Sequence, residues 1–424
     1  MNLTNDQQVV ADAIIGGKSI ALLAPAGVGK SFILKKTLPK LKDVAIVAPT
    51  GVAAVNIGMG ATTIHRLFGF STNILQEPKF NGSNGLSASS GRNKILSKIK
   101  TLVIDEIGMV RVDLLEAVDA RLQRIHKNNK PFGGIQVIAT GDFSQLAPVV
   151  SGQEKKYFNM VYDSRWAFSS NAFKSLPIYT LKLNMRNDNT TQQKVLNSIR
   201  DKDGNVQQAL DIIIKHSKPY DPNDERIVLC SYNADADRIN IEKLNNNTNP
   251  AKKYYSIDKG EKKYLKDVPV DDVVVMKEGL RVMIVANDQG GAYVNGDMGY
   301  VQACYDGAVV VKLDRTGKEV VVQPNIWDIC EYTFKGGKLS PRPIAERTQI
   351  PIKLAYAVSI RKSQGKTLDS ACINLGYKTF AENILYVALS RVRDLKNLSF
   401  VRYPTIDDVI VDKESSEFMK NLEG

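Results

Sequence analysis

The stretch SIALLAPAGVGKSFILKK, residues 19–36, decides the fold of this chain. Its first five residues suit a buried strand and its last residues suit a helix, so the glycines lie at a strand-to-helix turn. Phosphate-binding loops follow the pattern G-x-x-x-x-G-K-[ST]. Gly29, Lys30 and Ser31 match this pattern, whereas Ala24 occupies the position of the first glycine. The alternative is a turn of small residues that binds nothing, and the rest of the chain has to discriminate between the two.

A phosphate loop binds anions because consecutive backbone N–H groups converge where the chain turns into a helix. Gly27 and Gly29 would give the backbone its freedom, and Ala24 is tolerated if its φ angle stays negative. Lys30 would reach the β- and γ-phosphates, and the hydroxyl of Ser31 would bind magnesium. The stretch therefore predicts ATP and Mg²⁺ as ligands.

Three more apolar runs of strand length follow, at residues 44–48, 101–105 and 135–140. We expect a helix after each of the first three strands, and the clearest one has apolar residues at helical spacing over residues 115–125. This alternation predicts an α/β fold with a doubly wound parallel sheet. Such sheets bind ligands at the carboxyl ends of their strands.

Polar residues follow these strands where a nucleotide site needs them. Asp105 and Glu106 end the third strand, and such a carboxylate pair can bind magnesium and polarise water. Gln145, in GDFSQLAPV after the next strand, is a neutral donor for a γ-phosphate. Arg186, and Arg391 on a predicted helix, could act as arginine fingers. Taken singly, each has an ordinary alternative: a solvated strand end, a polar turn or a surface ion pair.

The second half of the chain contains an interruption of the α/β pattern. The pattern resumes near residue 226 and returns after residue 350, but residues 271–324 consist of short β-branched segments. Asn295-Gly296 and Asp306-Gly307 are typical hairpin turns between such strands. The order predicts a small β-barrel inserted into a second α/β lobe.

The composition favours a polyanion partner and a reducing compartment. Lys and Arg total 57 against 45 Asp and Glu, a formal net charge of +12, which attracts nucleic acid. The four cysteines include no C-x-x-C pair and there are only three histidines, which argues against zinc. No apolar run approaches the ~18 residues of a membrane span, and the first residues do not resemble a secretion signal. We therefore expect a cytoplasmic protein.

As an ordered set, the motifs resemble those of the PIF-one (petite integration frequency) family of superfamily 1 DNA helicases, which is related to the RecD and Dda helicases. In chain order they are LTNDQ, APAGVGKS, APTGVAA, TIHRLFG, VIDEIGMV, GDFSQLAPV, LNMR, SIRKSQGKT and YVALSRVR. No single motif is specific, but the set covers nearly the whole chain. The resemblance implies two RecA-like phosphate-loop lobes: residues 1–185 with an inserted wedge loop at 71–94, and residues 186–250 with 346–424, into which an SH3-like β-barrel is inserted at 251–345.

The resemblance also implies roles for individual residues. The catalytic residues would be Lys30, Asp105, Glu106, Gln145, Arg186 and Arg391, with Asp105 and Ser31 as metal ligands. The cofactor-binding residues would be Gln7 at the adenine, Ala26, Gly27, Val28, Gly29, Lys30, Ser31, Phe32, Gln145, Arg186, Gly365 and Arg391. The DNA-binding residues would be Pro49, Thr50, Thr63, His65, Arg361, Lys362, Ser363 and Gln364.

Four positions depart from the family pattern. Ala24 replaces a glycine, Ala147 replaces a proline and Arg361 replaces a histidine. Gly108 stands where the family has a serine, so a hydroxyl that could link the acidic pair to DNA is missing. We expect these changes to affect coupling and rate more than the class of activity.

The sequence thus predicts an ATP-dependent DNA helicase that moves 5′ to 3′ on single-stranded DNA and unwinds duplex DNA. Its expected partners are single-stranded, duplex and forked DNA, and no membrane partner is expected. We expect it to act as a monomer. The resemblance also implies roles in DNA replication, recombination and repair. One alternative is a strand-binding ATPase that remodels protein–DNA complexes without unwinding. Another is a small-molecule kinase, which explains Lys30 and Asp105 but neither the second lobe nor the charge.

Overall fold

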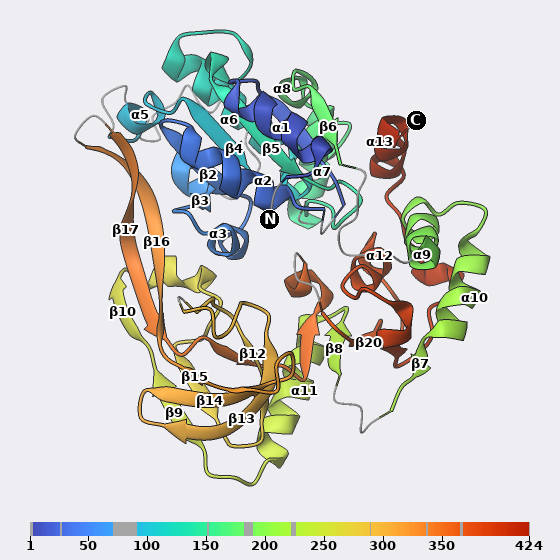
Figure 1. The fold of residues 1–424 in the computed structure, drawn as a ribbon. Coiled ribbons are helices and arrows are strands. Elements are labelled where there is room, and N and C mark those ends of the chain that lie inside the picture. Colours follow the sequence, from blue (N-terminus) through green and yellow to red (C-terminus); the bar gives the residue numbers. More distant parts are fainter. Residues whose placement is uncertain are drawn as a thin grey trace. The chain divides into compact units, whose positions relative to one another are not determined.

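We describe a computed structural model of the chain (Figure 1). The described residues are 3–25, 28–70, 91–150, 152–181, 190–221, 226–288, 290–335, 338–364 and 368–423. The chain forms two compact units. Unit 1 contains Met1–Met185, Asp328–Ile344 and Glu417–Gly424, and unit 2 contains Arg186–Trp327 and Ala345–Ser416.

Unit 1 is built on a six-stranded sheet in which every pair of neighbours is parallel. In spatial order its strands are β3 (Thr62–Thr63), β2 (Val44–Ala48), β4 (Thr101–Ile104), β5 (Gln136–Gly141), β1 (Ile20–Leu23) and β6 (Ile178–Thr180). Its helices are α1 (Asn5–Ile15), α2 (Lys30–Thr37), α3 (Gly51–Ile57), α4 (Ile64–Phe68), α5 (Gly91–Leu96), α6 (Val112–His126), α7 (Gly152–Val161), α8 (Asn171–Lys174) and the end of α13 (Lys413–Glu423). The four predicted strands and the predicted helices after the first three are confirmed.

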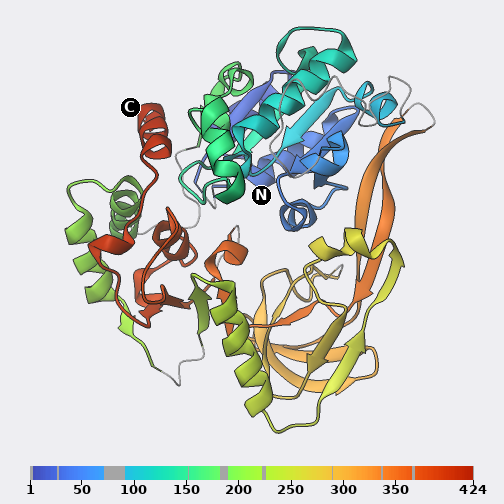
Figure 2. The ribbon, with the colours of Figure 1, turned by 180° about the vertical axis from the view of Figure 1, so that it is seen from behind.

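Both faces of this sheet are covered, because its strands are apolar on both sides. On β1, Ile20 and Leu22 pack into one buried cluster with α1 and α2, while Ala21 and Leu23 pack into a second cluster with α4 and α6. Figure 2 shows α6 in front of the sheet. The α/β fold class predicted from the sequence is confirmed for this unit.

Unit 2 contains a second parallel sheet with helices around it. In spatial order its strands are β19 (Ala357–Ser359), β8 (Ile227–Cys230), β20 (Ala371–Asn374), β21 (Leu398–Phe400) and β7 (Lys218–Pro219). The helices are α9 (Thr190–Asp201), α10 (Val206–His216), α11 (Asn233–Asn246) and α12 (Ile384–Leu389).

The rest of unit 2 is antiparallel and encloses its own apolar core. A five-stranded sheet has the order β15 (Glu319–Val322), β14 (Ala308–Leu313), β13 (Met298–Tyr305), β12 (Arg281–Ile284) and β18 (Ile352–Leu354). A smaller sheet pairs β11 (Val273–Met276) with β9 (Lys252–Tyr255). In another, β17 (Lys338–Gln349) lies between β10 (Ile257–Gly260) and β16 (Asn325–Lys335), and residues 328–344 of β16 and β17 belong to unit 1. The likeness of this region to an SH3 barrel stays a prediction.

The two predicted hairpin turns have different outcomes. Tyr305 pairs with Ala308, so Asp306-Gly307 is the two-residue turn between β13 and β14. Asn295-Gly296 lies instead inside a longer connection, because β12 ends at Ile284 and β13 begins only at Met298.

The division into units differs from the predicted boundaries at two segments. Residues 328–344 were predicted to lie in the inserted barrel and residues 417–424 in the second lobe, whereas both segments belong to unit 1. Residues 417–424 are held to unit 1 by aromatic contacts of Phe418. Phe418 stacks on Phe168 with ring centroids 4.2 Å apart and meets Phe143 edge-on at 5.4 Å.

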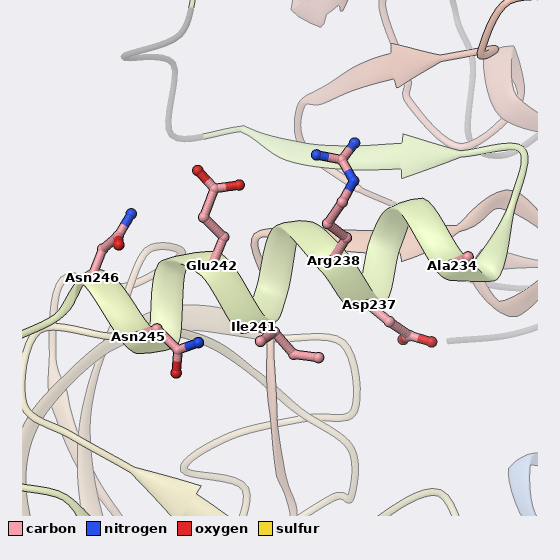
Figure 3. A pocket seen from close by; sticks show the side chains of 7 residues that line it. All are labelled: Ala234, Asp237, Arg238, Ile241, Glu242, Asn245 and Asn246. Carbon is pink, nitrogen blue, oxygen red and sulfur yellow. The ribbon is translucent and has the colours of Figure 1, made fainter.

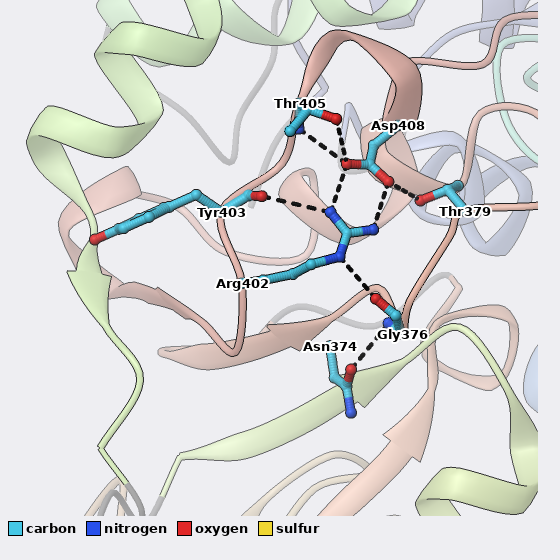
Figure 4. A network of polar contacts seen from close by, with 7 residues as sticks. All are labelled: Asn374, Gly376, Thr379, Arg402, Tyr403, Thr405 and Asp408. Atoms are coloured by element: carbon cyan, nitrogen blue, oxygen red, sulfur yellow. Dashed lines mark hydrogen bonds and ion pairs between the residues drawn. The ribbon is translucent and has the colours of Figure 1, made fainter.

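An ion pair between the buried Asp408 and the partly exposed Arg402 fixes the segments after β20 and β21 of unit 2 (Figure 4). Two guanidinium nitrogens of Arg402 donate to the two carboxylate oxygens of Asp408, each at 2.7 Å. Arg402 Nε donates to the carbonyl of Gly376 at 2.7 Å, and Thr379 Oγ1 donates to Asp408 at 2.6 Å. Burial alone would raise the pKa of Asp408, but hydrogen bonds from Arg402, Thr379 and Thr405 outweigh it and hold that pKa far below its usual range.

Asp408→Ala should therefore lower the free energy of unfolding by about 3 kcal/mol, because it leaves the guanidinium of Arg402 without its partner. A group whose pKa is depressed by folding stabilises at neutral pH, and that contribution is lost as the pH falls below about 4. Urea denaturation at pH 7 and at pH 3 measures both effects, with the exposed neighbour Asp407→Ala as control. Equal denaturation midpoints for the two variants at pH 7 would contradict the assignment.

Among the described residues, no helix is both long enough and apolar enough to cross a membrane.

Candidate functional site

The carboxyl edge of the sheet in unit 1 gathers the residues predicted to handle ATP. Lys30 is the first residue of α2, which follows β1, and Asp105 and Glu106 follow β4. Gln145 comes four residues after the end of β5, and β5 lies between β4 and β1 in the sheet. Because these strands are parallel, their carboxyl ends meet at one edge.

The described residues of the turn between β1 and α2 are compatible with a phosphate loop. Gly29 caps α2 with φ +98°, a left-handed conformation that favours glycine. Ala24 is not among the residues with positive φ, so alanine is accommodated as predicted. The Lys30 ammonium donates to the carbonyls of Ala24 at 2.5 Å and Pro25 at 3.0 Å. To reach a phosphate, Lys30 has to exchange these two acceptors.

Gln7 is held against this loop from α1. It is buried, its Oε1 accepts from the backbone N–H of Thr4 at 3.2 Å, and its Nε2 donates to the carbonyl of Val28 at 3.0 Å. A Cβ at Gly29 would lie 2.6 Å from Gln7 Nε2. The structure thus gives Gln7 a contact with the loop itself, in addition to the adenine contact that stays a prediction.

Ala24→Gly, which restores the family pattern, should change ATP turnover by less than about twofold. The Ala24 methyl is buried among apolar residues, so its loss costs about 1 kcal/mol of stability without moving the loop's donors. Steady-state ATPase assays measure the effect. The contrasting variant is Gly29→Ala, which should abolish turnover because of its positive φ and the overlap with Gln7. A large loss in Ala24→Gly would show that the first glycine is needed after all.

The acidic pair is fixed by its neighbours. Thr140, on β5, donates a short hydrogen bond from its hydroxyl to Asp105 Oδ1. Glu106 has φ +54° and ψ +46°, a left-handed conformation that is uncommon for a residue with a side chain and that clusters at functional sites. The carboxylate of Asp105 is therefore oriented by a tertiary contact, and Glu106 is placed by its left-handed backbone conformation.

Asp142, which was not predicted as a site residue, orients Gln145, the predicted γ-phosphate contact. Asp142 is buried, and its carboxylate accepts from the backbone N–H of Ser144 at 2.9 Å and from Gln145 Nε2 at 3.0 Å. Thr140 was missed as well. The signal for both was the string TGD at the end of β5, which lies at the same sheet edge as the acidic pair.

Gly108 is explained by packing. It lies in a short 3-10 helix, Ile107–Met109, and a Cβ on Gly108 would overlap the backbone carbonyl of Asp142. A Cβ on Gly141 would lie 2.9 Å from the backbone nitrogen of Ile107. The turn that carries Glu106 and the turn that carries Gln145 thus meet backbone to backbone, and glycine permits this contact.

Gly108→Ser, although it restores the family residue, should therefore lower turnover by about tenfold or more, because the turn carrying Glu106 has to shift. It should also cost about 1–3 kcal/mol of stability. Gly204→Ser is a suitable control, since no atom of the described chain lies within 4 Å of the position of its Cβ. Steady-state ATPase assays and urea denaturation test both effects, and wild-type turnover in Gly108→Ser would refute this reading.

The residues present fit a magnesium ion. Ser31 lies in the first turn of α2 and offers a hydroxyl, and Asp105 offers a carboxylate at the neighbouring strand end. Mg²⁺ prefers oxygen ligands and is usually held by one or two protein groups together with phosphates. Accordingly, the described residues contain no cluster of three or more acidic, histidine or cysteine side chains suited to a metal.

The predicted DNA contacts of unit 1 lie at helix starts. Thr50 caps α3 and Thr63 caps α4, with their hydroxyls accepting from Ala53 and Arg66 N–H at 3.2 Å each. Pro49 follows β2 directly. The pKa of His65 is lowered, first by burial and then by the positive charge of Arg111, so its ring is neutral at pH 7.

The predicted DNA contacts of unit 2 lie after β19. Arg361 and Lys362 are exposed and Gln364 is partly buried. Although the Arg361 side chain as a whole is exposed, neighbouring atoms partly bury its guanidinium and lower the pKa of Arg361. Ser363 is fully buried and its hydroxyl donates to the carbonyl of Ile360 at 2.7 Å, so a DNA contact through this hydroxyl stays a prediction that would require it to leave this acceptor.

Arg391 differs from its prediction. The sequence analysis placed it on a helix, but α12 ends at Leu389, with Ser390 as its C-cap, and Arg391 lies beyond it. Arg391 is fully buried, and its guanidinium donates to the carbonyls of Val387 at 2.9 Å and Ser363 at 3.3 Å and to the hydroxyl of Ser390 at 2.7 Å. As an arginine finger it would have to leave these partners.

Several predicted residues lie outside the described part of the chain. These are Ala26, Gly27, Arg186 and Gly365, together with residues 71–90 of the predicted wedge loop.

A shallow hollow of about 600 Å³ lies along α11 in unit 2 (Figure 3). Its lining residues all come from this one helix: Ala234, Asp237, Arg238, Ile241, Glu242, Asn245 and Asn246. Polar groups from different elements do not converge there, as they do in ligand sites.

Known proteins share this arrangement. Residues 2–209 match the model of the family described as PIF1-like helicase. The ATP-dependent DNA helicase Pif1 of Bdellovibrio bacteriovorus is 29% identical over 437 residues, which cover 100% of this chain and 93% of that protein. Human ATP-dependent DNA helicase PIF1 is 33% identical over 410 residues, which cover 93% of this chain but only 60% of the human protein.

Solved structures agree with this match. Unliganded Pif1 from a Bacteroides species is 31% identical, with a TM-score of 0.89, over 100% of this chain and 98% of that one. Bacteroides Pif1 in complex with ADP-AlF4 gives a TM-score of 0.90 at 30% identity, and the form bound to single-stranded DNA gives 0.69 at 31%, each over 100% of this chain and 97% of the other. The resemblance drawn from the motifs is thereby confirmed, and the chain belongs to the PIF1-like helicase family.

Proposed function

We propose that this chain is an ATP-dependent DNA helicase that moves 5′ to 3′ along single-stranded DNA and unwinds duplex DNA. The observation that carries the proposal is the single sheet edge in unit 1 where Lys30, Asp105, Glu106 and Gln145 follow neighbouring parallel strands. The relatives and solved neighbours, named as ATP-dependent DNA helicases or determined with ADP-AlF4 and with single-stranded DNA, support it. The direction of movement rests on the family resemblance.

In this proposal each residue has a physical task. Lys30 would neutralise the β- and γ-phosphates, and Ser31 with Asp105 would hold Mg²⁺, which supplies positive charge to the leaving group. Glu106 would orient and deprotonate the attacking water. Gln145, oriented by Asp142, would contact the γ-phosphate without adding charge.

Single-stranded DNA would be bound by both units, through Pro49, Thr50, Thr63 and His65 in unit 1 and through Arg361, Lys362 and Gln364 in unit 2. The number of chains that act together has to be tested separately, because one solved structure of a relative is described as two coordinating Pif1 helicases at forked double-stranded DNA. We propose a monomeric motor as the basal unit, which sedimentation with one single-stranded oligonucleotide tests directly.

The decisive experiment compares two forked duplexes that differ only in the polarity of the single-stranded tail. We expect ATP-dependent strand separation with the 5′ tail and little with the 3′ tail, and ATP hydrolysis that rises when single-stranded DNA is added. Hydrolysis that ignores DNA would refute a motor function. Stimulated hydrolysis without separation of either fork would favour remodelling of protein–DNA complexes over unwinding.

A further inference from the structure

A buried arginine in unit 1 has no counter-charge among the described residues. Arg121, on α6, is only 5% exposed, and its Nη2 donates to the side-chain oxygen of Asn93 on α5 at 2.8 Å. Its Nη1 is buried without a hydrogen-bond partner, and no carboxylate pairs with it among the described residues. Burial, followed by repulsion from Arg92 and Arg124, lowers the pKa of Arg121 to about 10. An unpaired buried charge lowers the stability of the fold, so binding of an anion near Arg121 would be favourable.

Exposed cations surround this arginine. Arg92 on α5 and Arg124 on α6 lie on the surface beside it, and the exposed Lys98 lies in the turn that follows the end of α5 at Leu96. The cluster, here named the α5–α6 patch, thus consists of the exposed Arg92, Lys98 and Arg124 above the buried Arg121. A buried cation beneath exposed ones raises the potential at the surface and favours a polyanion over a single carboxylate.

A hollow of about 600 Å³ adjoins the end of this patch, where α6 stops. Lys98, Lys100 and His126 are among its lining residues. His126 Nε2 is buried and has no hydrogen-bond partner among the described residues. Lys100 pairs with Asp43 at 3.5 Å, so its charge is partly compensated. The hollow therefore adds an unpartnered polar atom at the border of the patch.

The α5–α6 patch lies away from the nucleotide residues. Asp43 precedes β2, Lys100 precedes β4 and Gln136 begins β5, and all three line the hollow, which therefore lies at the amino edge of the sheet. Lys30, Asp105 and Gln145 lie at the carboxyl edge. The patch is consequently no part of the ATP site, and the predicted single-strand contacts after β2 and β3 are also at the other edge.

We propose that the α5–α6 patch binds the phosphates of duplex DNA at a fork, through Arg92, Lys98 and Arg124. Double-stranded DNA carries one negative charge per ~1.7 Å of its axis, which suits cations spread over two helices and the turn after α5. The inference rests on the proposed function, because a helicase at a fork meets a duplex as well as the strand that it translocates on. Arg121 is a positioning residue, which supplies fixed positive charge and holds α5 through Asn93.

The test is the triple variant Arg92→Gln, Lys98→Gln and Arg124→Gln. Its control, Lys35→Gln, Lys40→Gln and Lys174→Gln, removes the same charge from exposed lysines of unit 1 elsewhere. Fluorescence anisotropy over a range of salt should show a fork affinity about tenfold weaker than wild type, with a slope of log affinity against log salt smaller by about 2–3. Affinity for the single strand alone and strand-stimulated ATPase should stay unchanged.

Equal losses for fork and single strand, or equal losses in the control variant, would overturn the proposal. Unchanged fork affinity would do the same and would point to an acidic protein partner or a second copy of this chain. Failure of the proposed function would be seen differently: ATP hydrolysis by the wild-type protein would not rise when DNA is added.

Arg121→Gln gives an independent readout. Replacing a buried unpaired charge is expected to leave the thermal midpoint unchanged or higher, while fork affinity falls at least threefold. A merely structural arginine would show the reverse, a lower thermal midpoint with normal fork affinity, and that result would contradict the assignment.

Discussion

Lys30→Ala is expected to reduce ATP hydrolysis by at least about a hundredfold while leaving the affinity for single-stranded DNA within about twofold of wild type. The ammonium of Lys30 sits at the start of α2, where the helix N-terminus and the loop N–H groups already favour phosphate. Removing a preorganised charge from the site where transition-state charge develops costs this much in typical enzymes. The predicted DNA contacts lie on other loops, so strand binding should persist.

Phosphate release with excess single-stranded DNA measures turnover, and anisotropy without nucleotide measures strand binding. Lys35→Ala is the matched control, because Lys35 is exposed on the same helix. The fold should tolerate Lys30→Ala, since the carbonyls of Ala24 and Pro25 lose a partly exposed donor and no buried one. Turnover within threefold of wild type would mean that this turn does not bind the triphosphate.

Local patterns in the sequence were sufficient for four of the six strands in the sheet of unit 1 and for the choice of the residues proposed for the ATP site; β3 and β6 were not predicted. Glycines at a strand-to-helix turn and an acidic pair after an apolar strand are short-range signals, and parallel pairing brings them to one edge. The boundaries of these strands were predicted to within one residue because each is a short run of buried apolar residues.

Contacts between distant residues were beyond the sequence. Thr140 on Asp105 and Asp142 on Gln145 require knowing that β4 and β5 are neighbours and how their ends are oriented. Gly108 is the sharpest case. In the sequence, Gly108 is notable only because the family has a serine hydroxyl at this position. The structure shows that the carbonyl of Asp142 occupies the space that a side chain at this position would need.

Arg391→Ala is expected to lower ATP turnover by about a thousandfold while leaving ATP affinity nearly unchanged, because an arginine finger acts mainly in the transition state. The structure adds a competing explanation. Arg391 is fully buried and its guanidinium donates to the carbonyls of Val387 and Ser363, so its removal also takes one hydrogen bond from each of these carbonyls in unit 2. A lower turnover alone would therefore not establish the finger.

Three measurements separate the two explanations. If Arg391 is an arginine finger, Arg391→Ala should have a low kcat with normal ATP affinity. Its thermal midpoint should then be close to that of Arg391→Lys, a variant that keeps the positive charge but not the planar guanidinium. A structural role predicts a lower thermal midpoint and a rise in KM together with the loss of kcat. Arg393→Ala is the control, because Arg393 is exposed two residues further along. If it lost turnover while Arg391→Ala kept it, the finger would be Arg393, and the buried guanidinium would serve to fix Ser363.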